Sequence, residues 1–279
     1  MFVEKSKMAT LKELNRKVNR LKSTRKITNT MKLVAISRIK RMQARQVLIN
    51  SYYKELIRIA TATNILPDTS DWITGNNEGR LKKFLLVITS DHGMCDGFNH
   101  ILCTTVLKWV KEKAENKDTE IGFYGKKGYL MLKEFFPAAI LYQGVTANPR
   151  YLDAVRIGTD LQKRFQIMGY SEIWIAYNIV KGKGSVIPVI KKILPIETDE
   201  VKKRITAQYL YLKLYNLLVK NAEGEQTARA IAMDSATRNV DELIDKYIVM
   251  RNRTRQAVIT KELIEVTTGA EVLRSGGTF

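Results

Sequence analysis

The chain has 279 residues, 45% of them hydrophobic, which is enough to build one large or two ordinary domains. Its formal net charge of +19 favours an anionic partner, which could be nucleic acid, a lipid surface or an acidic protein. The two cysteines, Cys95 and Cys103, exclude a disulfide-stabilised scaffold, and no apolar run reaches the roughly 18 residues of a membrane span.

A long helix is predicted near the start of the chain, after a leader at 1–8 that lacks the apolar core of a secretory signal. Met8 is an alternative start. Residues 9–64 contain neither Gly nor Pro, Thr10 and Glu13 have capping-box spacing, and one heptad register of apolar or small residues runs through the segment. The register comprises Leu11, Leu14, Val18, Leu21, Thr28, Ala35, Ile39, Met42, Ile49, Tyr53, Leu56 and Ala60, with Arg25, Lys32 and Gln46 at the remaining positions.

The middle of the chain alternates between strand and helix patterns. Short apolar runs predict strands at 83–90, 120–124, 138–142, 171–180 and 186–196, separated by helices at 98–114, 126–136 and 149–168. A turn-rich surface loop is expected at 66–79. The alternation predicts an α/β domain over 80–196 with a mostly parallel sheet, and Pro188 favours an edge position for the last strand.

A second long helix is predicted over 210–275. More than forty residues separate Gly224 from Gly269 without a Pro, and apolar or small residues recur at alternating steps of three and four. These residues are Met233, Ala236, Val240, Leu243, Tyr247, Met250, Thr254 and Ala257. Two terminal helices with matching seams predict an antiparallel coiled coil.

The sequence contains few candidate catalytic or ligand-binding residues. Neither a P-loop nor a Gly-rich dinucleotide motif is present, although Gly125 and Gly128 follow a strand and open a helix, where phosphate can bind. Asp91, His92 and Cys95 share a strand-to-helix loop, which allows nucleophilic catalysis or metal binding, with a structural turn as the simpler interpretation.

The charge of the first helix leaves two interpretations open. Fourteen Lys or Arg residues lie between Lys12 and Arg58, against only Glu13 and Glu55. Such a helix suits either nucleic-acid binding or an acidic protein surface.

Four stretches carry a resemblance to one family, the gamma subunits of F-type ATP synthases. TLKELNRKVNRLKSTRKITNTMKLVAISRIKRMQ (10–43) resembles the opening of these proteins, and EQTARAIAMDSATRNVDELIDKYIVMRNRTRQAVITKELIEVTTGAEVL (225–273) resembles their last helix. ITSDHGMCDGFN (88–99) is similar to a loop with the pattern T-S-D-R-G-L-C-G-G-F-N, and 176–196 matches more weakly.

The resemblance implies a fold of two terminal helices in an antiparallel coiled coil with a central Rossmann-like α/β domain. It implies a non-catalytic rotor shaft that couples ion flow through a membrane ring to ATP synthesis or hydrolysis. The expected partners are the alpha and beta subunits of the catalytic hexamer, the epsilon subunit and the membrane c-ring. No cofactor, no direct nucleotide and no nucleic acid are expected.

The resemblance also assigns roles to residues. Met31 matches a methionine that faces an acidic lever of the catalytic subunit, while Arg255, Gln256 and Thr260 match a polar cluster that contacts the head. The apolar end expected to sit in a bearing comprises Leu263, Ile264, Val266, Val272 and Leu273, and the family loop comprises Ser90, Asp91, Gly93, Cys95, Gly97, Phe98 and Asn99.

The chain departs from the family pattern at several positions, with His92, Met94 and Asp96 in the loop where Arg, Leu and Gly are usual, and Lys261 in place of Gln. These departures leave room for a rotor of a repurposed F-type motor, and a basic coiled-coil nucleic-acid-binding protein is the alternative from another class. The expected location is peripheral, on the cytoplasmic face of a bacterial inner membrane, or else on an organelle inner membrane.

Overall fold

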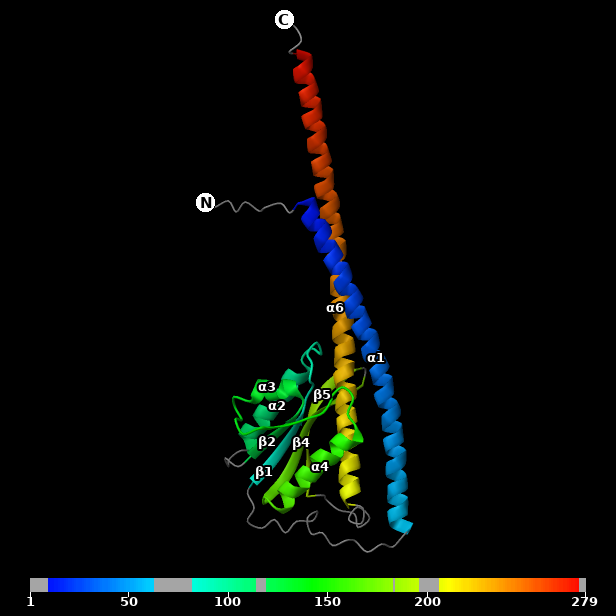
Figure 1. Ribbon diagram of the computed structural model, residues 1–279, viewed down its shortest axis with the longest axis vertical. Coiled ribbons are helices and arrows are strands. Elements are labelled where there is room, and N and C mark those ends of the chain that lie inside the picture. The colour runs from blue at the N-terminus through cyan, green and yellow to red at the C-terminus, as the bar shows by residue number, and fades with distance from the viewer. Residues whose placement is uncertain (1–9, 63–81, 114–118, 183, 196–205, 276–279) are drawn as a thin grey trace. The chain divides into compact units, whose positions relative to one another are not determined.

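The computed structural model describes residues 10–62, 82–113, 119–182, 184–195 and 206–275 (Figure 1). Internal contacts divide the chain into one unit from the N-terminus to Met31 and from Met233 onward, and a second unit spanning Lys32–Ala232. Two long helices, α1 (Leu11–Ala62) and α6 (Thr206–Ser275), contribute residues to both units. The predicted leader and the predicted loop at 66–79 lie outside the described residues.

In the first unit the two helices run antiparallel. Arg25 of α1 forms an ion pair with Asp241 of α6 at 3.2 Å, and Thr28 accepts a hydrogen bond of 2.8 Å from the Thr237 hydroxyl. The residue numbers rise along α1 as they fall along α6, as predicted. At the start of α1, the Thr10 amide donates to the Glu13 carboxylate and the Glu13 amide to the Thr10 hydroxyl, which confirms the capping box.

The seam predicted for α1 matches the burial along the helix. From Leu11 to Leu56, every apolar or small seam residue is buried or half-buried. The seam predicted for α6 is wrong at Met250, which is 50% exposed, and at Ala257, which is exposed too. It is also wrong at Leu243, which is 41% exposed, whereas its neighbour Ile244 is buried. Both residues are apolar, and a straight helix drifts from a strict seven-residue repeat, so the pattern alone does not distinguish a step of three from a step of four.

The second unit contains a five-stranded sheet in the order β3-β2-β1-β4-β5. Its strands are β1 (Lys82–Ile88), β2 (Thr119–Tyr124), β3 (Ile140–Tyr142), β4 (Tyr170–Lys181) and β5 (Ser185–Leu194). The first four are parallel, whereas β5 returns antiparallel to β4. This confirms the mostly parallel sheet. It also places Pro188 on an edge strand, where a missing amide costs no ladder bond.

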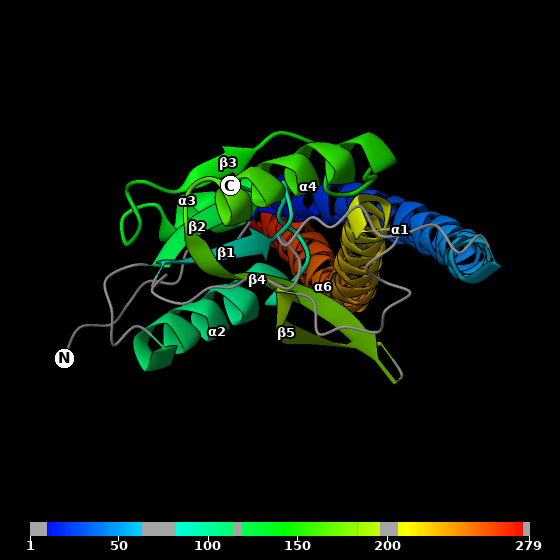
Figure 2. The same ribbon diagram turned by 90° about the horizontal axis from the view of Figure 1, so that it is seen from below.

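Helices cover both faces of this sheet (Figure 2). The helices α2 (Phe98–Lys113) and α3 (Lys126–Leu132) pack on one face, and α4 (Tyr151–Gln166) packs with the first part of α6 on the other. Because β1 lies at the centre, Phe84 and Leu86 enter one core while Leu85 and Val87 enter the other, which explains its continuous apolar run. The predicted helix at 126–136 is four residues too long: α3 ends at Leu132.

Within the same unit, α1 packs along α6 and extends the core. Met42, Ile49 and Leu56 share one apolar cluster with Leu212 and Val219. The pairing here is also antiparallel, because the Tyr53 and Tyr209 rings lie 5.7 Å apart whereas Gln46 donates to Glu223 at 2.6 Å.

Candidate functional site

The loop between β1 and α2 is held together by its own side chains. The Ser90 amide donates to Asn99 Oδ1 at 2.9 Å, and Asn99 Nδ2 donates back to Ser90 Oγ at 2.8 Å. Ser90 Oγ in turn donates to the His92 carbonyl at 2.6 Å. Met94 and Asp96 have positive φ of 60° and 50°, so the turn adopts the left-handed conformation with an Asp where the family has a Gly. Asp tolerates this region better than most residues.

Asp91 ties the loop to the start of α3. Its Oδ1 accepts from the Lys126 amide at 3.1 Å, while the Lys127 amide donates to the Ser90 carbonyl and the Gly128 amide to Thr89 Oγ1. The first-turn amides that a phosphate would need therefore already have protein acceptors. A Cβ at Gly125 would lie 2.5 Å from the Thr89 carbonyl oxygen, so close packing explains this glycine without a ligand.

A buried ion pair on α6 anchors the same loop from the other side. Glu225 is 0% exposed, and its Oε1 lies 2.8 Å from Arg229 Nη2, one turn later. Arg229 also donates to the Gly93 carbonyl at 3.3 Å, and the Thr146 hydroxyl lies 3.3 Å from Glu225 Oε2. Burial raises the pKa of the Glu225 carboxyl, and the adjacent Arg229 cation opposes that rise.

Thr146 joins the two anchors. Its amide and hydroxyl both donate toward Asp91 Oδ2, at 3.0 and 3.2 Å, and it accepts from the Asp91 amide. Thr146, Glu225 and Arg229 are not among the site residues predicted from the sequence. Their spacing offered a partial signal for the last two, since an acid and a base one turn apart on a helix can pair, but it does not indicate burial.

The side chains proposed for Cys/His chemistry do not converge. Cys95 is buried and accepts a weak hydrogen bond from Asn99 Nδ2 at 3.6 Å, and burial raises the pKa of its thiol. A nucleophilic cysteine needs the opposite, a stabilised thiolate. The His92 side chain is exposed, and the residue contributes only its carbonyl to the loop. Among the described residues, no group of three His, Cys, Asp or Glu side chains is placed to hold a metal.

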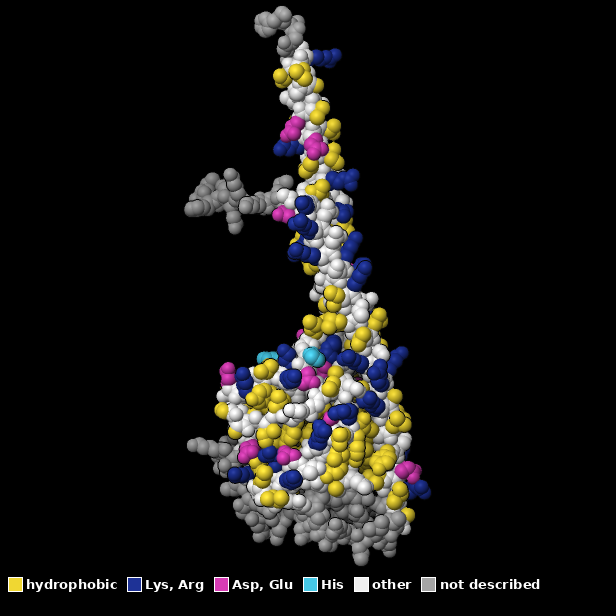
Figure 3. Space-filling model, viewed as in Figure 1, with side chains coloured by type: hydrophobic (Ala, Val, Ile, Leu, Met, Phe, Trp, Pro, Cys, Tyr) yellow, Lys and Arg dark blue, Asp and Glu magenta, His cyan; other side chains and the backbone are white. Residues whose placement is uncertain are grey.

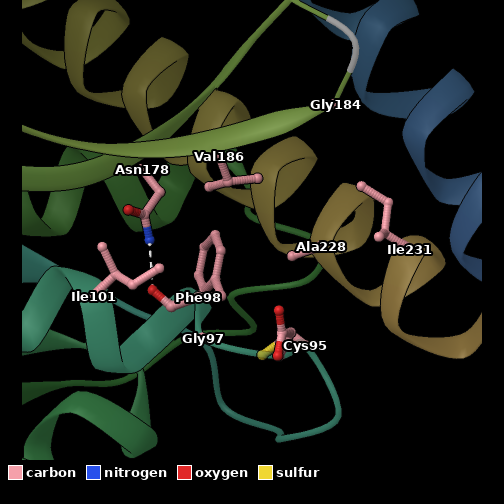
Figure 4. A pocket seen from close by; sticks show the side chains of 10 residues that line it. Cys95, Gly97, Phe98, Ile101, Asn178, Gly184, Val186, Ala228 and Ile231 are labelled. Atoms are coloured by element: carbon pink, nitrogen blue, oxygen red, sulfur yellow. Dashed lines mark hydrogen bonds between the residues drawn. The ribbon is translucent and has the colours of Figure 1, made fainter. Parts of the chain in front are cut away.

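A small hollow lies where this loop meets α2, the β4–β5 hairpin and α6 (Figure 4). Its volume is about 130 Å³, and its walls are largely apolar, with Phe98, Val186 and Ala228 facing one another. Asn178 Nδ2 spans one side by donating to the Phe98 carbonyl at 3.0 Å. Ligand pockets usually measure roughly 300–1,000 Å³, so the hollow is too small for a nucleotide.

The residues expected to couple the shaft to a head lie in two separate places. Met31 is half-buried on α1, whereas Arg255, Gln256 and Thr260 are exposed on α6. Because Thr28 pairs with Thr237, Met31 lies near the level of residue 234, about 30 Å along α6 from Arg255.

The last part of α6 carries the residues predicted for the apolar end. All residues from 255 to 274 are exposed, among them the whole predicted apolar end. The exposed fractions are 61% for Leu263, 58% for Ile264, 70% for Val266, 64% for Val272 and 81% for Leu273. Within the described parts of the chain, no helix is long and apolar enough to cross a bilayer.

Comparison with known proteins gives a consistent result. The family model described as ATP synthase matches residues 10–273. The ATP synthase gamma chain of Pelagibacter ubique is 31% identical and that of Maricaulis maris 32%, each alignment covering 95% of this chain and 100% of the relative. A chain in the Euglena gracilis mitochondrial ATP synthase shares the fold at a TM-score of 0.65 and 17% identity, with 96% of each chain covered. The chain therefore belongs to the ATP synthase gamma-chain family.

Proposed function

We propose that the chain is the turning shaft of its complex and couples ion flow through a membrane ring to ATP synthesis or hydrolysis in a catalytic head. The observation that carries this is the exposed final stretch of α6. Most helix stability in proteins comes from packing of an apolar face, and every side chain of this stretch is exposed. Its Leu263, Ile264 and Val266 would each gain about 1.5–3 kcal/mol from full burial, so the stretch is built to be enclosed by a partner.

In this proposal the enclosing partners are the alpha and beta subunits, and the epsilon subunit and c-ring bind elsewhere on the chain. Leu263, Ile264, Val266, Val272 and Leu273 form the bearing end. Met31, Arg255, Gln256 and Thr260 contact the head at two levels of the shaft. A shaft whose sides differ in charge and shape stabilises different conformations of three catalytic subunits, and this unequal binding is what can drive them in turn.

The loop that begins at Ser90 supports this function by connecting the α/β layer to the shaft helix. The buried Glu225 and Arg229 fasten it to α6, so that a load on the α/β layer reaches the shaft helix through hydrogen bonds. Nucleotide chemistry belongs to the partners, and this chain contributes no catalytic group. The bacterial relatives favour the cytoplasmic face of an inner membrane as its location.

The test is affinity purification of the tagged chain from its native host, with partner identification and an ATPase assay. Recovery with two larger nucleotide-binding subunits and ATPase activity is expected, and membrane-ring subunits in the eluate would establish ion coupling. Recovery with nucleic acid or alone would refute the shaft, and a head recovered with unrelated proteins would point to a repurposed motor.

A matched pair of variants tests the bearing end. Leu263→Asp with Ile264→Asp should lower recovery of active complex at least tenfold, because it places charge in an apolar socket. Lys261→Gln, on the same exposed stretch, should leave recovery unchanged, since the pair of Lys261 with Glu265 is exposed and contributes little. Equal recovery of both variants would contradict the bearing role.

A further inference from the structure

An open apolar groove lies in the second unit where α1, α4 and α6 meet. Leu48 and Tyr52 of α1 form one wall, Leu212 and Tyr215 of α6 form the floor, and Tyr151 at the start of α4 closes the other side. The volume is about 350 Å³, and the Tyr151 and Tyr215 rings meet edge to face at 5.8 Å. We call this the tyrosine groove. Figure 3 shows hydrophobic side chains gathered on the same face, in the region where Figure 1 draws these three helices.

The groove continues into a stripe along α1. Leu48 is 69% exposed, Tyr52 56% and Ile59 52%, and their spacings of four and seven place them on one side of the helix. This side differs from the seam of Met42, Ile49 and Leu56, which α6 already covers. From residue 48 to residue 59 the stripe is about 17 Å long, or three helical turns. Thus α1 presents a second apolar surface, on which Leu48 and Tyr52 are each more than half exposed.

The surroundings of the groove are basic. Arg41 and Arg45 continue the stripe toward the N-terminus at helical spacing. Arg150 precedes α4 with its side chain 66% exposed, although it is paired with the buried Asp153 at 3.5 Å. Arg45 Nη1 donates to the Pro149 carbonyl at 3.2 Å, which fixes one guanidinium at the groove edge. One acid, Glu55, lies on the stripe between Tyr52 and Ile59, and it is paired with Arg58 at 2.8 Å. An occupant with negative charge on its flank would therefore be favoured over a basic one.

We propose that the tyrosine groove binds an amphipathic helix of a partner protein, with large apolar side chains on one face and acidic residues on its flank. Three features of the chain support this occupant: the helical spacing of the exposed stripe, the apolar lining of the groove by Tyr52 and Tyr215, and the charge of its rim. An apolar anchor at every third or fourth position of the partner enters the groove, as in helix-in-groove recognition. Carboxylates on the flank of the partner helix lie against Arg41 and Arg45, which carry the opposite charge.

The shape of the groove favours a helix over a small molecule. The exposed apolar residues extend past the groove to Ile59, so a compact ligand would leave Ile59 in contact with water. A partner helix three turns long would cover Leu48, Tyr52 and Ile59 together. Unlike the exposed end of α6, this surface plays no part in the proposed bearing, so the two proposals can fail independently.

The first test uses a synthetic probe and the detergent-free complex of the full chain with its catalytic head. The probe is a fluorescein-labelled 18-residue peptide with Leu at helical spacing on one face and Glu on the flanks, and fluorescence anisotropy reports binding. Leu48→Glu and Tyr52→Glu should each weaken binding at least tenfold, and Arg41→Glu at least threefold. All three side chains are exposed, so folding should be preserved, and ATPase activity of each complex checks assembly separately.

Two controls make the result specific. Leu130→Glu changes a leucine of similar exposure on α3, which packs on the other face of the sheet, and it should leave binding unchanged. A peptide with the same Leu face and Lys flanks should bind at least tenfold more weakly. Equal binding of the two peptides, or equal weakening by Leu130→Glu and Leu48→Glu, would overturn the proposal.

The second test identifies the natural occupant. A photo-crosslinking benzoylphenylalanine in place of Tyr52, in intact membranes of the host, should yield a cross-linked peptide whose sequence has helical apolar spacing and a net negative charge. Cross-links only to lipid, only to a second copy of this chain or only to a basic segment would refute the acidic helix as occupant.

Discussion

Replacing Arg229 by Met is the sharpest test of the link between α6 and the loop after β1. The substitution keeps the length of the side chain and removes its charge. The Gly93 carbonyl loses its donor, but Gly93 is exposed and water can replace it. The Glu225 carboxylate, fully buried at 2.8 Å from the lost cation, cannot be rescued in this way. Breaking a buried pair on one side costs about 3–5 kcal/mol, so the free energy of unfolding should fall by that amount near pH 8.

Two comparisons separate this cause from loss of packing. In the double variant Arg229→Met with Glu225→Gln no buried charge remains, so a large part of the loss, about 2 kcal/mol or more, should be recovered. The loss in Arg229→Met should also shrink as the solution is acidified. Without the cation, the pKa of Glu225 in the folded state rises further above its value in the unfolded state. A carboxyl shifted in this direction contributes stability at pH values below its unfolded-state pKa. That contribution is lost as the pH rises through its folded-state pKa.

The assay is urea unfolding followed by tryptophan fluorescence. Trp109 and Trp174 lie 5.3 Å apart in the sheet unit, so in a Trp72→Phe background their emission reports on the unit that holds the pair. Equal destabilisation by the single and double variants, with no change between pH 8 and pH 5, would refute the electrostatic explanation and leave packing alone.

Three further predictions follow from burial and close contact. Burial raises the pKa of Cys103 to about 11 and also raises that of Cys95, so at pH 8 a thiol reagent should modify the native chain at least 100-fold more slowly than the urea-unfolded chain. Gly158→Ala would put a Cβ 2.4 Å from Cδ1 of Tyr211 and should lower the free energy of unfolding by about 1–3 kcal/mol, measured by the same urea titration. On the proposal that Met31 contacts an acidic part of the head, Met31→Lys should place a cation at that contact and lower the number of protons pumped per ATP hydrolysed, measured by quenching of a pH-sensitive dye in vesicles.

Each of these predictions has a clear contrary outcome. Labelling of Cys95 or Cys103 as fast as in the unfolded chain would contradict their burial. Gly269→Ala is the control for Gly158→Ala, because no atom lies within 4 Å of its Cβ, and equal loss in both would rule out the clash. Unchanged pumping at an equal ATPase rate would refute the role given to Met31.

Much of the fold was readable in the sequence because burial repeats with the period of each element. The seam of α1 from Leu11 to Leu56 could be predicted since a helix that packs along a partner buries a residue every three or four positions. The parallel strands could be predicted because β1, buried on both faces, is apolar without alternation. Where two apolar residues were adjacent, as at Leu243 and Ile244, the pattern allowed both registers and only the contact with α1 selected one.

The candidate site depended more on the tertiary structure. Residues of the loop at 88–99 were recognised as a motif, yet what they do was hidden, since Asp91, Thr146 and Glu225 lie far apart in sequence and meet only through the packing of three elements. The same applies to the start of α3, where Gly125 suggested a phosphate site until Asp91 was seen to accept the amide of Lys126.

By itself, the sequence determined two long helices, a mostly parallel sheet between them, the excess of positive charge and the family. Each of these follows from local periodicity, composition or a contiguous motif. Only the tertiary structure decided that Glu225 and Arg229 are buried together, that Cys95 is a core thiol, and that Leu48 and Tyr52 line an open groove. Hydrogen bonds, desolvation and surface exposure depend on which residues folding places beside one another. The order of residues along the chain does not specify these spatial neighbours.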